Sequence, residues 1–136
     1  MPQEKYHLEI PSDPNNLITV EEFVNYFSKE LNLDEDKLST VLLAVTEAAT
    51  NAIKHANKND INKMVTIDAY VDDSNLIIKV KDEGHGFHPE EVPDPTLPEN
   101  ILKDSGRGVY LMKVYMDDVK YNQTPTGLET ILTIKL

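Results

Sequence analysis

The chain has 136 residues, with 13 basic and 24 acidic side chains, a net charge of -11 and no cysteine. This length is typical of one domain that buries its own core, so we expect a single domain over residues 1–136. The lack of cysteine excludes disulfides, a thiolate nucleophile and cysteine-ligated metals. The acidic excess argues against general nucleic-acid binding. Because the sequence has neither a signal-like start nor a bilayer-length apolar run, we expect a cytoplasmic protein without a membrane partner.

Residues 4–10 alternate weakly and predict a strand that ends at Pro11. Thr19 and Glu22 have the spacing of a capping box, which predicts that a helix begins there. Apolar residues follow this box at helical spacing. They are Val20, Phe23, Val24, Phe27 and Leu31. A second, longer helix is predicted from about Asp34 to His55.

Alternating residues over 65–71 predict a half-buried strand, and the polar run Asp72 to Asn75 predicts a hairpin turn after it. The next strand carries its apolar residues, Leu76, Ile78 and Val80, on one face. A third helix is predicted after Ser105, and two last strands around residues 119–122 and 128–136. Strands at both ends with about three helices predict an α+β fold, with one sheet and the helices on one of its faces.

Glu47 is the one formal charge between Leu38 and Ile53, and it lies opposite the apolar stripe of the second helix. Asn51 and His55 come at i+4 and i+8 from it, which predicts a row along one side of the helix. The neighbours of Glu47 on that side are uncharged, as in the wall of a pocket. A partly exposed surface row is the alternative interpretation, and the spacing alone favours it.

Asp82 continues the inward face of the second hairpin strand, and Gly84 and Gly86 come shortly after it. An inward carboxylate at a strand end, beside backbone that a ligand can approach closely, suits a ligand that donates hydrogen bonds, such as an exocyclic amine. An Asp that caps its own turn is the alternative.

A long loop over about residues 87–105 contains four of the eight prolines and lies between two glycine pairs. The second pair, Gly106 and Gly108, flanks Arg107 at the predicted start of the third helix. Free N–H groups at a helix start, with glycines and one arginine, suit a phosphate. A flexible hinge is an equal alternative. Near the C-terminus, Thr130 places a hydroxyl on an otherwise apolar strand face shortly after Gly127.

The order of these motifs resembles the ATP-binding fold shared by gyrase, heat-shock-ninety chaperones, histidine kinases and MutL, the GHKL superfamily. The matching segments are TEAATNAIKHA, VKDEGHGF, SGRGVYLMK and GLETILTI. The resemblance implies a two-layer sandwich of the Bergerat type, with a mixed, mostly antiparallel sheet and the loop over about 87–105 as an ATP lid. Length favours the bacterial anti-sigma factor serine/threonine kinases, which have neither a second domain nor a phospho-accepting helical hairpin.

The same resemblance implies roles for individual residues. Asn51 would hold Mg²⁺, Asp82 would accept from the adenine amino group with Thr130 nearby, and Arg107 would lie near the terminal phosphates. Glu47 would be the general base of phosphoryl transfer. Four glycines would shape the nucleotide site. They are Gly84, Gly86, Gly106 and Gly108.

Two classes of function remain open at the level of sequence. The first is an ATP-dependent protein serine/threonine kinase that phosphorylates an anti-anti-sigma-like partner, sequesters a sigma factor, or does both. The second is a non-catalytic module that uses nucleotide only to hold its shape and acts by sequestering a protein. Glu47 favours the kinase, because a purely structural nucleotide site has little use for a carboxylate near the terminal phosphate. A homodimer is compatible with either class.

Overall fold

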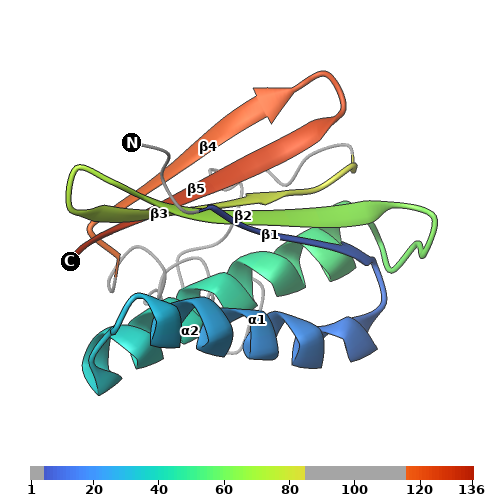
Figure 1. The fold of residues 1–136 in the computed structure, drawn as a ribbon. Coiled ribbons are helices and arrows are strands. Elements are labelled where there is room, and N and C mark those ends of the chain that lie inside the picture. The colour runs from blue at the N-terminus through green and yellow to red at the C-terminus, as the bar shows by residue number, and fades with distance from the viewer. Residues whose placement is uncertain (1–4, 85–115) are drawn as a thin grey trace, which may run out of the picture.

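One five-stranded sheet is the centre of the fold, and the computed structural model describes residues 5–84 and 116–136. The strands are β1 (Lys5–Pro11), β2 (Met64–Asp72), β3 (Asn75–Lys81), β4 (Asp118–Thr124) and β5 (Gly127–Lys135). Their order across the sheet is β1-β2-β3-β5-β4, and every neighbouring pair is antiparallel. The helices α1 (Leu17–Glu30) and α2 (Glu35–Thr50) cover one face of this sheet (Figure 1). The α+β, two-layer prediction is therefore confirmed.

Two details of that prediction differ. The described strands form a wholly antiparallel sheet rather than a mixed one. The described residues contain two α-helices, and the third helix predicted after Ser105 lies outside them.

The first helix begins earlier than the capping box predicts. Asp13 caps a short 3-10 turn (Pro14–Asn16), where its side chain accepts from the backbone N–H of Asn15, and α1 continues directly from this turn at Leu17. The prediction of a helix start at Thr19 is therefore wrong. Proline at the first position of a helical turn is pre-organised for it, so the signal at Asp13 and Pro14 takes precedence.

A tight connection joins the two helices. Asn32 adopts a left-handed backbone conformation with φ 56°, and Leu33 N–H donates to Ser28 C=O at 3.0 Å. This pattern is a Schellman ending, which satisfies the last carbonyls of α1. Asp34 then caps α2, because its side chain accepts from Lys37 N–H at 2.8 Å. The α2 start predicted at Asp34 is confirmed.

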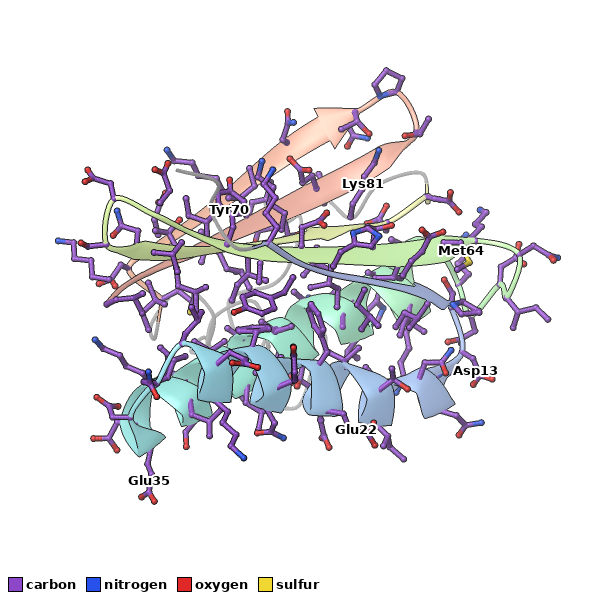
Figure 2. All side chains as sticks on the ribbon, viewed as in Figure 1. Asp13, Glu22, Glu35, Met64, Tyr70 and Lys81 are labelled. Carbon is purple, nitrogen blue, oxygen red and sulfur yellow. The ribbon has the colours of Figure 1, made fainter. Side chains whose placement is uncertain are left out.

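The core lies between the helices and one face of the sheet. Alternate residues of β2, β3 and β5 point into it, as the sequence predicts. Side chains fill the space between the helices and the sheet (Figure 2), and the largest of those with almost no exposed surface come from both layers. They are Phe27, Ile53, Ile67, Leu76, Ile78 and Leu132.

Both strand connections that the structure describes are short. The β2–β3 hairpin turns through Asp73 and Ser74, which have φ values of 51° and 66°. Positive φ at both central residues defines a type I′ turn, whose twist matches the strands that flank it. No helix within the described ranges is long and apolar enough to cross a membrane.

Candidate functional site

The antiparallel pairing of β3 with β5 brings two predicted site residues together. Val80 pairs with Thr130, so Asp82, two residues further along, lies beside the start of β5. Both polar residues are buried, with 4% of Asp82 and 9% of Thr130 exposed. Segments far apart in the chain thus form one polar end of the sheet.

Asp82 is held by backbone on two sides. Its Oδ1 accepts from Gly84 N–H at 3.1 Å and from Leu128 N–H at 3.1 Å, and its own N–H donates to Leu128 C=O at 3.0 Å. Asp82 therefore caps its own turn, as the alternative interpretation proposes. Within the described residues both side-chain bonds end on Oδ1, so this cap leaves Oδ2 available for the ligand interpretation as well.

Burial raises the pKa of the Asp82 carboxyl above its ordinary value, while the N–H groups of Leu128 and Gly84 and the positive charge of Lys63 oppose the rise. A buried carboxylate is stabilised by a partner that donates hydrogen bonds. An amine of a ligand would be such a partner.

Two glycines allow close backbone approach at this end of the sheet. A Cβ on Gly84 would lie 2.1 Å from the carbonyl oxygen of Ala56, and a Cβ on Gly127 would lie 1.9 Å from the carbonyl oxygen of Asp82. Neither distance is possible for a real side chain. Gly84 therefore joins the strand end to the end of the helical layer, and Gly127 joins it to β5.

The second helix changes its winding where the predicted row passes through it. After Thr50 it continues as a π-helical turn (Asn51–Ala56), in which Asn57 N–H donates to Ala52 C=O at 2.9 Å. Glu47 is half-buried and Asn51 is buried, whereas His55 is exposed. Of the three residues in the predicted row, His55 is the exposed one, and it lies inside the π-turn, where the backbone hydrogen bond spans five residues instead of four. Such turns are frequent at functional sites.

Asn57, directly after the π-turn, is a buried residue that sequence reasoning missed. Its Nδ2 donates to Ser12 Oγ at 2.8 Å and to Met64 C=O at 3.1 Å, and its Oδ1 accepts from Glu83 N–H at 2.9 Å. It has no exposed surface. Asn57 thus joins the end of the helix to the ends of β1 and β3 and to the start of β2. Periodicity could not reveal it, because it lies beyond the last regular turn.

The structure brings together only part of the predicted site. Asp82, Gly84 and Thr130 lie at one end of the sheet, and Asn51 begins the π-turn that ends at Ala56, the residue that Gly84 contacts. Glu47 lies one turn earlier on α2. The remaining residues and the predicted lid over about 87–105 lie outside the described residues. These residues are Gly86, Gly106, Arg107 and Gly108.

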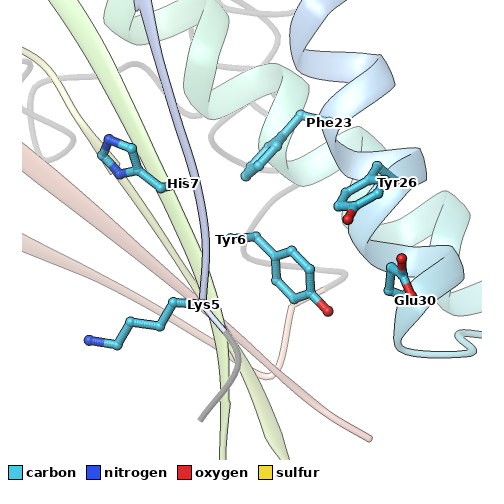
Figure 3. Close-up of a pocket in the computed structure, with 6 residues that line it drawn as sticks. All are labelled: Lys5, Tyr6, His7, Phe23, Tyr26 and Glu30. Atoms are coloured by element: carbon cyan, nitrogen blue, oxygen red, sulfur yellow. The ribbon is translucent and has the colours of Figure 1, made fainter. Parts of the chain in front are cut away.

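A hollow of about 490 Å³ lies elsewhere, between β1 and α1. Figure 3 shows Tyr6 of β1 facing Phe23 and Tyr26 of α1, whereas Lys5 and His7 point to the other side of β1. These residues and Glu30 line the hollow. None of the predicted site residues lines this hollow, so it is separate from the polar end of the sheet.

The two-layer fold and the buried Asp82 at the end of β3 agree with what a comparison with protein families finds. The family model of the histidine kinase-like ATPase domain matches residues 10–134. The chain therefore belongs to this family, and the predicted GHKL resemblance is confirmed.

Curated relatives narrow the comparison. The chain is 29% identical over 132 residues to the serine-protein kinase RsbW of Bacillus subtilis (strain 168), covering 93% of this chain and 82% of that protein. It is 35% identical over 117 residues to the anti-sigma F factor of Geobacillus stearothermophilus, covering 83% of this chain and 79% of that protein.

Solved structures agree on the fold. The RsbU and RsbW domains of Rv1364c from Mycobacterium tuberculosis match with a TM-score of 0.74 at 18% identity, over 99% of this chain and 33% of that one. The catalytic domain of the histidine kinase ThkA matches with a TM-score of 0.59 at 16% identity, over 95% of this chain and 97% of that one.

Proposed function

We propose that this protein is an ATP-dependent serine/threonine kinase of the anti-sigma factor type. It phosphorylates an anti-anti-sigma-like protein, and it also binds a sigma factor. Its relatives named serine-protein kinase and anti-sigma F factor support this proposal. The observation that carries it is the buried Asp82 carboxylate, which is fixed through one oxygen beside Thr130 in a fold of the ATPase family. A cytoplasmic location and a homodimer belong to the same proposal.

Asp82 recognises the adenine amino group through Oδ2. The two backbone N–H groups on Oδ1 hold the carboxylate in one orientation, so it does not need to reorganise when a ligand binds. The adenine amino group donates a hydrogen bond to the buried Asp82 carboxylate. A ligand without a donor at this position would leave the carboxylate unpaired and would therefore bind more weakly.

Glu47 acts as the general base. It accepts the proton of the partner's Ser or Thr hydroxyl as that oxygen attacks the γ-phosphorus of ATP, and the bond to the ADP oxygen breaks. Proton transfer of this kind contributes about a hundred- to ten-thousand-fold in rate. The half-buried position of Glu47, four residues before the buried Asn51, is compatible with this role.

The residues on this side of the helix fit a magnesium ion. The amide oxygen of Asn51 is a hard oxygen donor, and Mg²⁺ is held in such sites by one or two protein oxygens together with phosphate oxygens and water. Asn51 would hold the ion. When bound, Mg²⁺ neutralises part of the negative charge of the phosphates. A protein with a net charge of -11 would otherwise repel them.

The glycines and Arg107 have the remaining proposed roles. Gly84, Gly86, Gly106 and Gly108 shape the nucleotide site, and Arg107 lies near the terminal phosphates. The segment over about 87–105 is the lid that closes on ATP. The whole chain, residues 1–136, is one ATP-binding domain.

A ligand titration tests nucleotide binding. Thermal unfolding is followed with MgATP, MgADP and MgGTP. A specific ligand at about 100 times its dissociation constant adds roughly 2.7 kcal/mol to the free energy of unfolding. We expect the adenine nucleotides alone to stabilise the protein. Equal stabilisation by all three, or by none, contradicts the proposal.

Two substitutions separate binding from transfer. Glu47→Gln should keep MgATP affinity within about twofold and lower phosphorylation of the partner by at least about a hundredfold. Asp82→Asn should weaken MgATP binding itself, because its amide group can still accept on Oδ1 but brings a donor to the adenine amino group. Glu35→Gln and Asp36→Asn, both exposed in the first turn of α2, are the matched controls. Phosphate transfer by Glu47→Gln at the parental rate excludes Glu47 as the base.

A further inference from the structure

Tyr121 lies directly beside the predicted site on the neighbouring strand. In the register of β4 and β5, Tyr121 pairs with Thr130, and in that of β3 and β5, Thr130 pairs with Val80. Residues that pair across strands point to the same face of a sheet. Tyr121 therefore points to the face that carries Val80, Thr130 and Asp82, which is the face covered by the helices (Figure 1).

A row of side chains crosses the sheet at this level. Ile67 of β2 and Val80 of β3 are apolar, with 0% and 2% of their surface exposed. Thr130 of β5 and Tyr121 of β4 continue the row with two hydroxyl groups. The row thus changes from apolar to polar next to Asp82, at the same end of the sheet.

The Tyr121 hydroxyl is buried but lacks a hydrogen-bond partner among the described residues. Two other hydroxyl oxygens share this condition, those of Ser28 and Thr46, and both lie on helices. A buried hydroxyl without a partner destabilises a protein by about 1–3 kcal/mol, so such a group usually has a partner in the functional state. Burial also raises the pKa of Tyr121, which keeps its proton on the phenol oxygen.

We propose that the Tyr121 hydroxyl is a specificity-determining group that hydrogen-bonds the base of the bound nucleotide. This inference rests on the proposed ATP-binding function and adds a contact that the sequence motifs do not include. A phenol can donate and accept, whereas the ionised Asp82 can only accept. Adenine presents an amino donor and ring-nitrogen acceptors, while guanine presents a carbonyl where adenine has its amino group. Asp82 therefore selects the amino group of adenine, and Tyr121 donates to a ring nitrogen of the base that Asp82 holds in place, a contact that guanine would not make in the same orientation.

Tyr121→Phe tests the proposal, because it removes one oxygen and keeps the ring. We expect the nucleotide-free protein to keep or increase its melting temperature, since the substitution removes an unpaired buried hydroxyl. MgATP affinity should fall about 3- to 10-fold, as expected for one lost neutral hydrogen bond. MgGTP affinity should change by less than about twofold, so that the preference for ATP narrows.

Tyr70→Phe is the matched control. Tyr70 lies on the opposite face of the same sheet, where Lys5 and Lys79 approach its ring (Figure 2). Removal of the Tyr70 hydroxyl should leave the affinities for MgATP and MgGTP unchanged.

The outcomes separate this inference from the proposed function. If the parental protein does not bind MgATP, both fail. If the parental protein binds and Tyr121→Phe binds equally well, the hydroxyl does not contact the base and the proposal fails. A lower melting temperature with unchanged affinity gives the hydroxyl a structural role instead. Equal losses for ATP and GTP also overturn the proposal, because the contact would then not distinguish the bases.

Discussion

The two ends of β3 differ in how the chain is held there. At its start, the β2–β3 hairpin closes through two residues with positive φ, and Leu136 N–H at the end of the chain donates to the turn at Ser74 C=O. At its end, Asp82 is bound to Leu128, and the residue after it, Glu83, is bound to Asn57. The first end has a tight two-residue turn in addition to its long-range contact, whereas the second end, within the described residues, has no turn to β5 or to the helix and is held by side-chain and backbone bonds to Leu128 and Asn57. The difference teaches that the geometry around Asp82 depends on side chains from other segments, whereas the geometry of the hairpin depends mainly on the backbone of its own two turn residues.

The substitution with the largest expected effect disrupts the end of β3 near Asp82. Gly127→Ala places a Cβ where the Asp82 carbonyl lies, so β5 and the end of β3 must separate. We expect a loss of about 2–3 kcal/mol in the free energy of unfolding. Urea unfolding measures it. Thr126→Ala, at an exposed neighbouring position, is the control and should change stability by less than about 0.5 kcal/mol. A Gly127→Ala variant as stable as this control would show that the close approach is not required.

Asn57→Ala tests the polar links of the same end. The substitution removes the bonds that Asn57 makes with Ser12, Met64 and Glu83, of which the first is buried and the other two are partly buried. We expect a loss of about 2 kcal/mol in the free energy of unfolding. The exposed Asn62→Ala should stay within about 0.5 kcal/mol of the parental protein. Because Asn57 positions the Asp82 segment, MgATP affinity measured in folded Asn57→Ala should fall as well, and an unchanged affinity would limit Asn57 to a structural role.

Substitutions in the β2–β3 turn, at the other end of β3, should increase the stability of the protein. Type I′ turns prefer Asn-Gly, so the double substitution Asp73→Asn and Ser74→Gly relieves side chains held at positive φ. We expect a gain of about 0.5–1 kcal/mol in unfolding free energy and no change in MgATP affinity. A change in nucleotide affinity would show that the two ends of β3 are coupled.

The smallest expected effect lies on the outer face of the sheet, away from both ends. His7 Nδ1 lies 2.6 Å from Asp68 Oδ1, and this hydrogen bond raises the pKa of His7 above 6.5. The folded protein therefore holds the proton more tightly than the unfolded chain. The stabilisation is present below pH 6.5 and is lost as the pH rises through the folded-state pKa.

His7→Gln should remove this pH dependence. The difference in unfolding free energy between the parental protein and the variant, measured from about pH 5.5 to 8.5, should shrink as the pH rises. The effect is small because the pair is exposed. A difference that grows with pH would contradict the assigned direction.

Sequence reasoning succeeded where a repeating pattern had one structural meaning. The alternation of Leu76, Ile78 and Val80 predicted which face of β3 is buried and that Asp82 continues it, and the structure confirms both. Asp34 marked the start of α2 because its side chain accepts from an N–H group three residues further along the chain. These signals depend on neighbours in sequence, which is why one sequence was enough to predict them.

It failed where the outcome depends on contacts distant in sequence or on a change of winding. The spacing of Asn51 and His55 fits an α-helix, and nothing in it indicates the π-turn that contains both residues. The role of Asn57 depends on where Ser12 and Glu83 arrive in space. The glycine motif predicted close approach of a ligand at Gly84, whereas the group that lies against Gly84 in the structure is the Ala56 carbonyl of the chain itself.

The π-turn also constrains how this domain can be engineered. Its extra width decides where the Ala56 carbonyl is presented, and Gly84 has room for only a hydrogen atom there. A chimera that replaces Asn51–Ala56 with an ordinary α-helical segment would rotate that carbonyl, and deleting one residue to restore the angle would shorten the link to Asn57. The segment and the strand end that it meets are therefore a single exchangeable unit, and they should be transplanted together.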